Sequence, residues 1–244
     1  MKYLDFIYGD FEFVTVETLN KINEARRTCE NLGVGVFSDE LVLNKLGRKP
    51  IRPYMERAQI MYAIKGVDFV FEVTDETKID VKKEEFYYVQ NEKKEYKIGY
   101  APGTYDLFHQ GHLEHLTEAF SKCEILVVGI NDDELVKSYK EKTPLMTAEE
   151  RAEIVSKLKF VDATFIADTL ERGKANEWIK NKYGSGIDAV FIGSDWVGQD
   201  LHNKENLNIV FTDRDPETMK VRSSTYYREQ LKNQSRWLLD AIVY

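Results

Sequence analysis

A long internal repeat constrains the fold of this chain more than any other feature of its sequence. Shifting the sequence by 94 positions aligns residues 9–73 with residues 103–167 without a gap. Roughly a third of the aligned residues are identical, including Asp39-Glu40-Leu41-Val42 with Asp133-Glu134-Leu135-Val136, and self-similarity of this extent indicates a duplicated unit. We therefore expect the two segments to share one fold.

Apolar segments alternate with amphipathic helical segments in the second copy and in the residues that follow it. Strands are predicted at Tyr96–Ala101, Ile125–Ile130, Ala163–Ile166, Ala189–Ile192 and Ile209–Phe211, and helices from about His112 to Lys122, Thr147 to Leu158 and Leu170 to Tyr183. This alternation predicts a parallel sheet with right-handed crossovers, a Rossmann-like α/β domain that binds ligands at the carboxyl ends of its strands. The segment Thr147-Ala148-Glu149-Glu150 predicts a capping box at the start of its helix.

The segment GTYDLFHQGH, residues 103–112, links the first predicted strand of the second copy to its first predicted helix. It places a glycine where a strand ends, and it places His109 and His112 on one side of the first helical turn. Backbone amides in such a turn can approach an anion closely, and the helix dipole adds to the attraction. The segment therefore predicts a phosphate site. A metal site built on His-x-x-His and a purely structural role are the alternatives.

The composition argues against several classes of partner. The net charge of -8 over 244 residues argues against nucleic acid as the main partner, although positive groups can still cluster around a small anion. Cys29 and Cys123 are the only cysteines, which provides no disulfide framework and suits a cytoplasmic protein. We expect no signal peptide and no membrane insertion, because no segment has the required apolar run.

The segment at residues 103–112 resembles the motif G-x-F-D-x-x-H-x-G-H of the cytidylyltransferase-like family of nucleotidyltransferases, with Tyr105 at the aromatic position. The resemblance covers residues 96–232 and is closest to the branch of glycerol-3-phosphate, cholinephosphate and ethanolamine-phosphate cytidylyltransferases. It implies attack of a substrate phosphate oxygen on the α-phosphorus of a nucleoside triphosphate. It also implies Mg²⁺ that accompanies the triphosphate without direct protein ligands.

The resemblance also implies which residues form the site. It assigns charge stabilisation to His109, His112 and Lys140, and nucleotide or phosphate binding to Gly103, Thr104, Tyr105, Asp106, Gly111, Lys142, Arg151, Gly193, Asp195, Trp196, Arg222, Ser223, Ser224 and Thr225. Some of these residues have an alternative, structural interpretation. The lysines can be solvated residues of a loop, predicted at Val136–Thr143; Trp196 can belong to the core; and the Ser-Ser-Thr run can be a helix N-cap.

The C-terminal part of the domain departs from the family pattern and leaves the nucleobase open. The family motif R-T-E-G-I-S-T-T is altered here, because six residues separate Arg214 from Val221. The run from Ser223 to Arg228 is also similar to the I-S-S-T-x-I-R motif of adenylyltransferases in the wider superfamily. The segment Gly193-Ser194-Asp195-Trp196 is similar to the G-D-D-W of glycerol-3-phosphate cytidylyltransferases and favours CTP, with ATP as the alternative.

The first copy lacks the residues to which the resemblance assigns chemistry. Thr15 and Thr18 replace the two histidines, and Glu17 replaces Gly111, where a carboxylate would repel phosphate. We interpret this copy as a degenerate half-domain that packs and shapes the site without chemistry of its own.

Two charged residues of the second copy are nevertheless retained in the first. Arg57 matches Arg151 and Asp68 matches Asp162, although no catalysis is expected in the first copy. This retention predicts that these residues also serve the fold, for instance through a buried ion pair.

The sequence thus predicts a degenerate half-domain at residues 1–75, a linker or hairpin at 76–95, a catalytic domain at 96–232 and a C-terminal tail at 233–244. The hairpin would run from Glu85 to Ala101. The expected activity is transfer of CMP from CTP to a small phosphate or phosphonate monoester, such as glycerol-3-phosphate, phosphocholine or phosphoethanolamine. An adenylyltransferase and a noncatalytic nucleotide-binding sensor are the alternatives. We expect either an intramolecular pseudo-dimer of the two copies or a homodimer.

Overall fold

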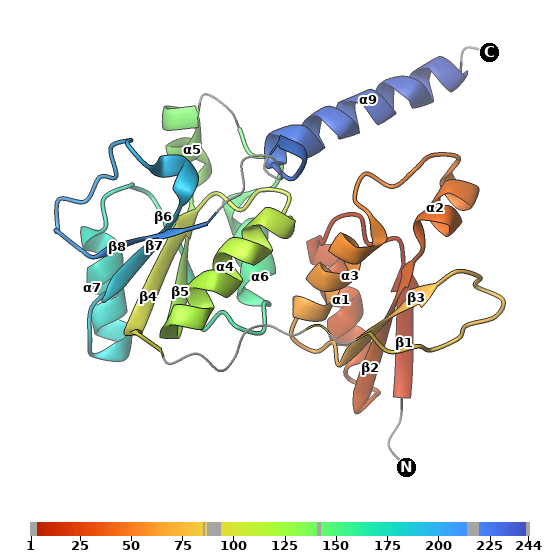
Figure 1. Cartoon of the computed structure of the whole chain (residues 1–244), viewed down its shortest axis with the longest axis horizontal. Coiled ribbons are helices and arrows are strands. Elements are labelled where there is room, and N and C mark those ends of the chain that lie inside the picture. The colour runs from red at the N-terminus through yellow and green to blue at the C-terminus, as the bar shows by residue number, and fades with distance from the viewer. Residues whose placement is uncertain (1–3, 85, 87–93, 141–142, 214–219, 243–244) are drawn as a thin grey trace. The chain divides into compact units, whose positions relative to one another are not determined.

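The computed structural model describes residues 4–84, 86, 94–140, 143–213 and 220–242, with the side chains of the last helix described as far as Gln234 (Figure 1). The chain divides into two compact units. The first contains Met1–Phe86, His109–Gly111 and Asp215–Tyr244, and the second contains Tyr87–Phe108 and His112–Arg214. Each unit has its own parallel sheet, so the protein belongs to the α/β class.

The first unit is built on a three-stranded sheet in the order β1-β2-β3. The strands are β1 (Leu4–Gly9), β2 (Asn31–Phe37) and β3 (Phe69–Val73), and the helices are α1 (Val16–Ala25), α2 (Asp39–Leu46), α3 (Tyr54–Ala63) and the C-terminal α9 (Ser224–Ile242). All residues of β2 but the first are buried, as in a central strand covered on both faces. Among the helices that the structure describes, none has both the length and the apolar character needed to cross a membrane.

The second unit is a five-stranded parallel sheet in the order β6-β5-β4-β7-β8, which confirms the predicted Rossmann-like fold (Figure 1). Its strands are β4 (Tyr96–Gly103), β5 (Cys123–Asn131), β6 (Ala163–Ala167), β7 (Ala189–Gly193) and β8 (Ile209–Thr212). Its helices are α4 (Gln110–Lys122), α5 (Asp133–Lys140), α6 (Ala148–Ser156) and α7 (Gly173–Tyr183), with a 3₁₀ turn η1 at Ser194–Trp196. The predicted strands and helices are all present, and the capping box of Thr147 and Glu150 is confirmed.

The predicted loop at Val136–Thr143 is wrong over its first part, because α5 extends to Lys140. The helix starts after Asp132, whose carboxylate accepts a hydrogen bond from the N–H of Leu135 at 2.6 Å. Leu135, Val136 and Tyr139 lie on one side of this eight-residue helix, but Val136 is its one buried residue and the other positions are polar or charged. Lys140 therefore lies in the last turn of a helix.

Strand β4 marks the point where the strand order of the parallel sheet changes direction. The chain passes from β4 to β5 and β6 on one side and then returns through α7 to β7 on the other side of β4. Right-handed crossovers accordingly place α4 and α6 on one face of the sheet and α7 on the other (Figure 1). The β4–β7 ladder ends at Tyr100 and Val190, whereas β4 continues to Gly103 and β7 to Gly193. Open α/β sheets bind their ligands at this position.

The two copies of the repeat fold alike, element by element. Adding 94 to the bounds of α2 gives the bounds of α5, and the same shift carries β3 onto β6. The strand order β1-β2-β3 likewise corresponds to β4-β5-β6. The first unit has no counterparts of β7 and β8 among its described residues, so it is a truncated copy of the fold, as predicted.

A buried arginine ties the segments of the first copy together. Arg57 is 1% exposed, and its guanidinium donates to the backbone carbonyls of Arg52 at 2.9 Å and Asp10 at 2.6 Å. It also forms an ion pair with Asp39 at 2.6 Å. One side chain thus connects the turn after β1, the start of α2 and the residues before α3.

The first copy uses the positions of the two histidines to start a helix. The hydroxyl of Thr15 accepts from the N–H of Thr18, and the hydroxyl of Thr18 accepts from the N–H of Thr15, both at 3.3 Å. This reciprocal pair is a capping box for α1. Glu17 lies exposed in the same turn and pairs with Lys21.

Replacing Arg57 with methionine should lower the free energy of unfolding by about 3 kcal/mol, because it leaves buried carbonyl groups and the Asp39 carboxylate without their donor. Urea denaturation measures this change. Lys21→Met, which removes an exposed ion pair of the same unit, should change the free energy of unfolding by no more than about 0.5 kcal/mol. Equal effects of the two substitutions would contradict the role of Arg57.

Candidate active site

The turn after β4 has an unusual backbone that is stabilised by its own aromatic ring. Tyr105 and Leu107 adopt left-handed conformations, with φ of 54° and 49°, which are uncommon for residues with side chains. The buried Tyr105 side chain folds back over the strand, and its hydroxyl donates to the carbonyl oxygen of Ala101 at 3.2 Å. A Cβ atom at Gly103 would lie 2.7 Å from this ring, so glycine leaves the space that the ring fills. The first copy keeps the left-handed conformation at Phe11, with φ of 47°.

The two motif histidines lie at the start of α4, as predicted. The helix begins at Gln110, so His109 directly precedes it and His112 is its third residue. The His112 ring packs edge-on against Tyr105, with 5.2 Å between the centroids, and lies 5.6 Å from the ring of Phe108. These contacts hold an imidazole beside the helix N-terminus, where the helix dipole favours an anion.

A second histidine of α4, His115, has a structural role that the motif did not indicate. The buried Nδ1 atom of His115 lies 2.6 Å from Oγ1 of Thr212, the last residue of β8. Its ring also stacks on Tyr105, with 6.4 Å between the centroids. His115 therefore connects α4 to β8 and supports the ring that shapes the motif turn. Its spacing of three residues from His112 is the one signal in the sequence that places it on the same helix face.

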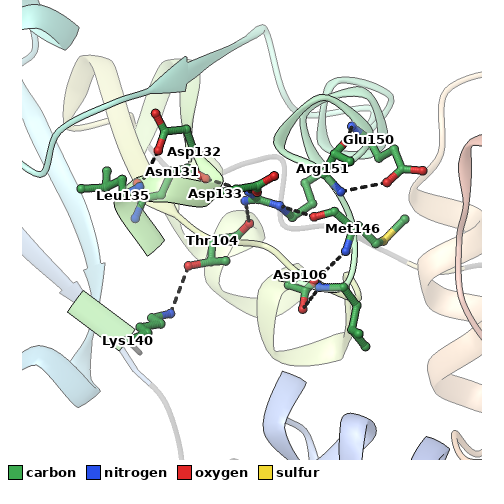
Figure 2. Close-up of polar contacts among 12 residues, drawn as sticks. Thr104, Asp106, Asn131, Asp132, Asp133, Leu135, Lys140, Met146, Glu150 and Arg151 are labelled. Carbon is green, nitrogen blue, oxygen red and sulfur yellow. Dashed lines mark hydrogen bonds and ion pairs between the residues drawn. The ribbon is translucent and has the colours of Figure 1, made fainter. Parts of the chain in front are cut away.

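Lys140 and Thr104 meet at the carboxyl end of β4 (Figure 2). The Nζ atom of Lys140 donates to Oγ1 of Thr104 at 3.0 Å. The hydroxyl of Tyr139 lies 3.2 Å from the same Oγ1 and accepts from the amide of Asn131 at 2.9 Å. The Tyr139 ring lies 6.4 Å from the ring of Trp196. The structure thus brings together three predicted residues, Thr104, Lys140 and Trp196, with Tyr139 as the residue between them.

Arg151 is completely buried and connects the motif turn to α5 and α6 (Figure 2). Its guanidinium donates to the carbonyls of Thr104, Asn131 and Met146, the last two at 2.8 and 3.1 Å, and pairs with Asp133 at 2.6 Å. Three of these four contacts recur, 94 residues earlier, around the arginine of the first copy. Because they occur in a copy without the histidines, these contacts belong to the fold.

Asp106 also holds the backbone of the site in place (Figure 2). Its carboxylate is 1% exposed and accepts hydrogen bonds from the N–H groups of Leu145 and Met146, both at 3.1 Å. Glu12 accepts from the N–H of Ile51 in the same way in the first copy. Asp106 therefore fixes the segment that leads into α6.

The glycine-ended segment after β7 combines a core residue with an exposed carboxylate. Gly193 ends the strand, and the next three residues form η1. Trp196 is partly buried and packs against the core cluster that includes Tyr100 and Ile192, whereas Asp195 is exposed. Trp196 therefore has the structural role weighed from the sequence as well as its contact with Tyr139.

Two motif residues and the C-terminal segment belong to the first unit. The ring of His109 packs against the ring of Tyr227 in α9, with 5.5 Å between the centroids. A Cβ atom at Gly111 would lie 3.3 Å from the backbone oxygen of Arg222, so the missing side chain allows this close approach. Within the first unit, His109 and Gly111 therefore lie against α9 and the segment that precedes it.

The Ser-Ser-Thr run begins α9. The hydroxyl of Ser223 accepts from the N–H of Tyr226 at 3.2 Å, and its carbonyl accepts from the N–H of Tyr227 at 3.0 Å. Ser223 therefore caps the helix, as in the alternative interpretation. Ser224 is partly buried and Thr225 is exposed.

Some predicted residues lie outside the part of the chain that the structure describes. They are Lys142, Arg214, and residues 85 and 87–93 of the predicted linker or hairpin. Within the described ranges, no group of three or more His, Cys, Asp or Glu side chains is arranged to hold a metal ion.

Comparison with known families agrees with the fold and the motif. The profile of the family described as cytidylyltransferase-like matches residues 100–230, more than half of the chain. The matched region contains the motif turn, the contact between Thr104 and Lys140, η1 and the start of α9. The chain belongs to the cytidylyltransferase-like family of nucleotidyltransferases.

Three relatives share parts of this region. The bifunctional protein HldE of Hyphomonas neptunium is 39% identical over 74 residues, which cover 30% of this chain and 15% of that protein. The FAD synthase of Thermococcus onnurineus is 39% identical over 77 residues, covering 32% of this chain and 51% of that protein. A probable ethanolamine-phosphate cytidylyltransferase of Encephalitozoon cuniculi is 34% identical over 98 residues, covering 40% and 29%. The chain thus spans at most about half the length of these relatives.

Lys140→Met should raise the KM for the nucleoside triphosphate about 10-fold, because the variant loses the cation beside Thr104. Loss of one charge-assisted hydrogen bond to a ligand lowers affinity by about this factor. Steady-state kinetics measures the change. Lys137→Met, on the same helix, should change this KM by less than about 2-fold. A similar effect of the two substitutions would show that Lys140 acts only through general charge.

Proposed function

We propose that the protein transfers CMP from CTP to a small phosphate or phosphonate monoester and releases pyrophosphate. The observation that carries this proposal is the position of the His-x-Gly-His motif. The motif follows β4, where the strand order of the sheet changes direction, and Lys140 contacts Thr104 of the same turn. Membership of the cytidylyltransferase-like family supports the reaction class.

In the proposed reaction, an oxygen of the acceptor phosphate attacks the α-phosphorus of the triphosphate. A new P–O–P linkage forms, the bond from the α-phosphorus to the oxygen that bridges the α- and β-phosphorus atoms breaks, and pyrophosphate leaves. The acceptor supplies its own nucleophile, so the protein has to align two anions and stabilise the developing charge. His112 at the start of α4 and Lys140 at the end of α5 are suited to this task.

Mg²⁺ would accompany the triphosphate and neutralise part of its charge. We take this cation to be bound mainly by phosphate oxygens and water. On this proposal the protein contributes positive charge through Lys140.

The relatives support two choices of nucleotide. The cytidylyltransferase of Encephalitozoon cuniculi and the similarity of Gly193–Trp196 to G-D-D-W favour CTP. The FAD synthase favours ATP, because FAD contains an adenine nucleotide, and the run from Ser223 to Arg228 is similar to an adenylyltransferase motif. We take CTP as the first candidate and ATP as the second. The ethanolamine-phosphate relative makes a phosphorylated amino alcohol the first acceptor to test.

The decisive measurement is pyrophosphate release with CTP and with ATP against glycerol-3-phosphate, phosphocholine, phosphoethanolamine and 2-hydroxyethylphosphonate. We expect turnover with CTP and one of these acceptors. Turnover with ATP alone would replace the cytidylyltransferase by an adenylyltransferase. Nucleotide binding without pyrophosphate release for any pair would favour a noncatalytic sensor.

His109→Ala and His112→Ala should each reduce turnover at least ~100-fold, the magnitude for losing one donor that stabilises a transition state. The matched control is Thr15→Ala with Thr18→Ala at the equivalent positions of the first copy. This pair should lower stability by about 1 kcal/mol through loss of the capping box and leave turnover nearly unchanged. Turnover near the wild-type value in both histidine variants would refute the assignment.

A further inference from the structure

A glutamate of the first copy holds both ends of the segment that begins α9. Glu56 lies in the first turn of α3 and is 5% exposed. One of its carboxylate oxygens pairs with Nε of Arg222, and the other accepts a hydrogen bond from the hydroxyl of Tyr227 at 3.1 Å. Burial raises the pKa of the Tyr227 hydroxyl, so this group remains a donor. Ser223, Ser224 and Thr225 lie between these two anchored residues.

An arginine of the first copy supports the same segment. The guanidinium carbon of Arg52 lies 4.2 Å from the ring centroid of Phe13 and 4.4 Å from that of Tyr227, so it is held between two aromatic rings. Burial lowers the pKa of Arg52 to about 10, and the side chain is still charged at neutral pH. The Tyr227 ring packs in turn against His109 of the motif. A continuous set of contacts therefore runs from the first copy through α9 to a predicted catalytic histidine.

The first copy has diverged from the second in a way that permits these contacts. Glu56 corresponds to Glu150, which completes the capping box of α6 by accepting the N–H of Thr147 at 2.8 Å. Pro53 occupies the position of Thr147 in the first copy, and proline has no N–H to donate. Glu56 cannot form the capping-box bond, and its carboxylate contacts Arg222 instead. A glutamate that caps the N-terminus of a helix in the second copy thus binds the C-terminal segment in the first.

We propose that Glu56 is a positioning residue for the β- and γ-phosphates of the nucleotide. It orients Arg222 directly and the Ser-Ser-Thr run through Tyr227, so the degenerate copy determines affinity for pyrophosphate and for triphosphate without touching either. This inference rests on the proposed function, because it takes the segment from Arg222 to Thr225 as the polyphosphate site. The close approach of the Arg222 backbone to Gly111 and the packing of Tyr227 on His109 support it, since both connect this segment to the motif.

The test compares ligand binding by the full chain and by its Glu56→Gln variant. Glutamine has the same shape and keeps an acceptor for the Tyr227 hydroxyl, but it removes the charge that holds Arg222. Calorimetric titration should show affinity for pyrophosphate and for CTP lowered about 10-fold, with little change for CMP, which lacks the β- and γ-phosphates. In turnover, the KM for the triphosphate should rise by a similar factor while kcat changes less than about 2-fold.

Asp39→Asn is the matched control, because it breaks the ion pair of the buried Arg57 in the same copy. It should reduce stability without lowering affinity for pyrophosphate relative to CMP. Tyr227→Phe separates the two contacts of Glu56, since it removes the hydroxyl and leaves the ion pair. We expect it to lower pyrophosphate affinity by less than Glu56→Gln does.

The outcomes distinguish this inference from the proposed function. Wild-type pyrophosphate affinity in Glu56→Gln, with normal turnover, would overturn the positioning role and leave the proposed function intact. An equal loss in Asp39→Asn would assign the effect to destabilisation and overturn it as well. Weakened pyrophosphate binding in Glu56→Gln without turnover of any acceptor by the wild type would support the inference and contradict the proposed function. A wild-type chain that binds neither pyrophosphate nor triphosphate would overturn both.

Discussion

Each copy of the repeat depends on the hydrogen bonds and the ion pair that one buried arginine makes. Arg151 connects the motif turn, the end of β5 and the residues before α6, and Arg57 does the same for the first copy. Most of the groups that accept hydrogen bonds from these arginines are backbone carbonyls. The contacts therefore depend on the path of the backbone more than on which side chains surround the arginine. A charge in this position would be costly without partners, and the paired aspartates supply the counterion. The surrounding side chains could therefore change while the framework stayed the same.

The two copies have used this common framework for different purposes. In the second, the helix start carries two histidines and a glycine; in the first, the same positions form a capping box and carry an exposed glutamate. At the start of α3 the difference has the opposite effect. Pro53 stands where the second copy has a threonine, so a capping contact is missing and Glu56 binds another partner. Loss of the motif residues and gain of contacts to α9 are thus separate changes within one retained fold.

The sequence was sufficient to predict the fold and the location of the motif but not the contacts that surround it. The predicted strands and helices with longer apolar segments were placed correctly, whereas α5 was taken for a loop because its eight residues include few apolar side chains. Tyr139 was missed because it lies on this helix, and its contact with Thr104 could not be foreseen for a residue of a loop. The contacts of Glu56 could not be predicted, because its partner Tyr227 is 171 residues away in the sequence and no local pattern relates the two residues. Retention of Arg57 in the first copy was the informative signal for the structural role of Arg151, but the predicted partner was wrong. The two arginines pair with Asp39 and Asp133, whereas the retained Asp68 and Asp162 accept the N–H groups of Leu32 and Leu126.

The left-handed backbone at Tyr105 has a consequence for how a ligand would be received. Such a conformation costs of the order of 1 kcal/mol for a residue with a side chain, and here packing of the ring over Gly103 and the hydrogen bond to Ala101 offset that cost. Phe11 has the same conformation in a copy without the histidines, so the turn is maintained by the protein itself and does not require a ligand. The motif turn is therefore preorganised. Association with an anion involves little loss of backbone entropy at this turn, and the affinity reflects the contacts made rather than the ordering of a loop.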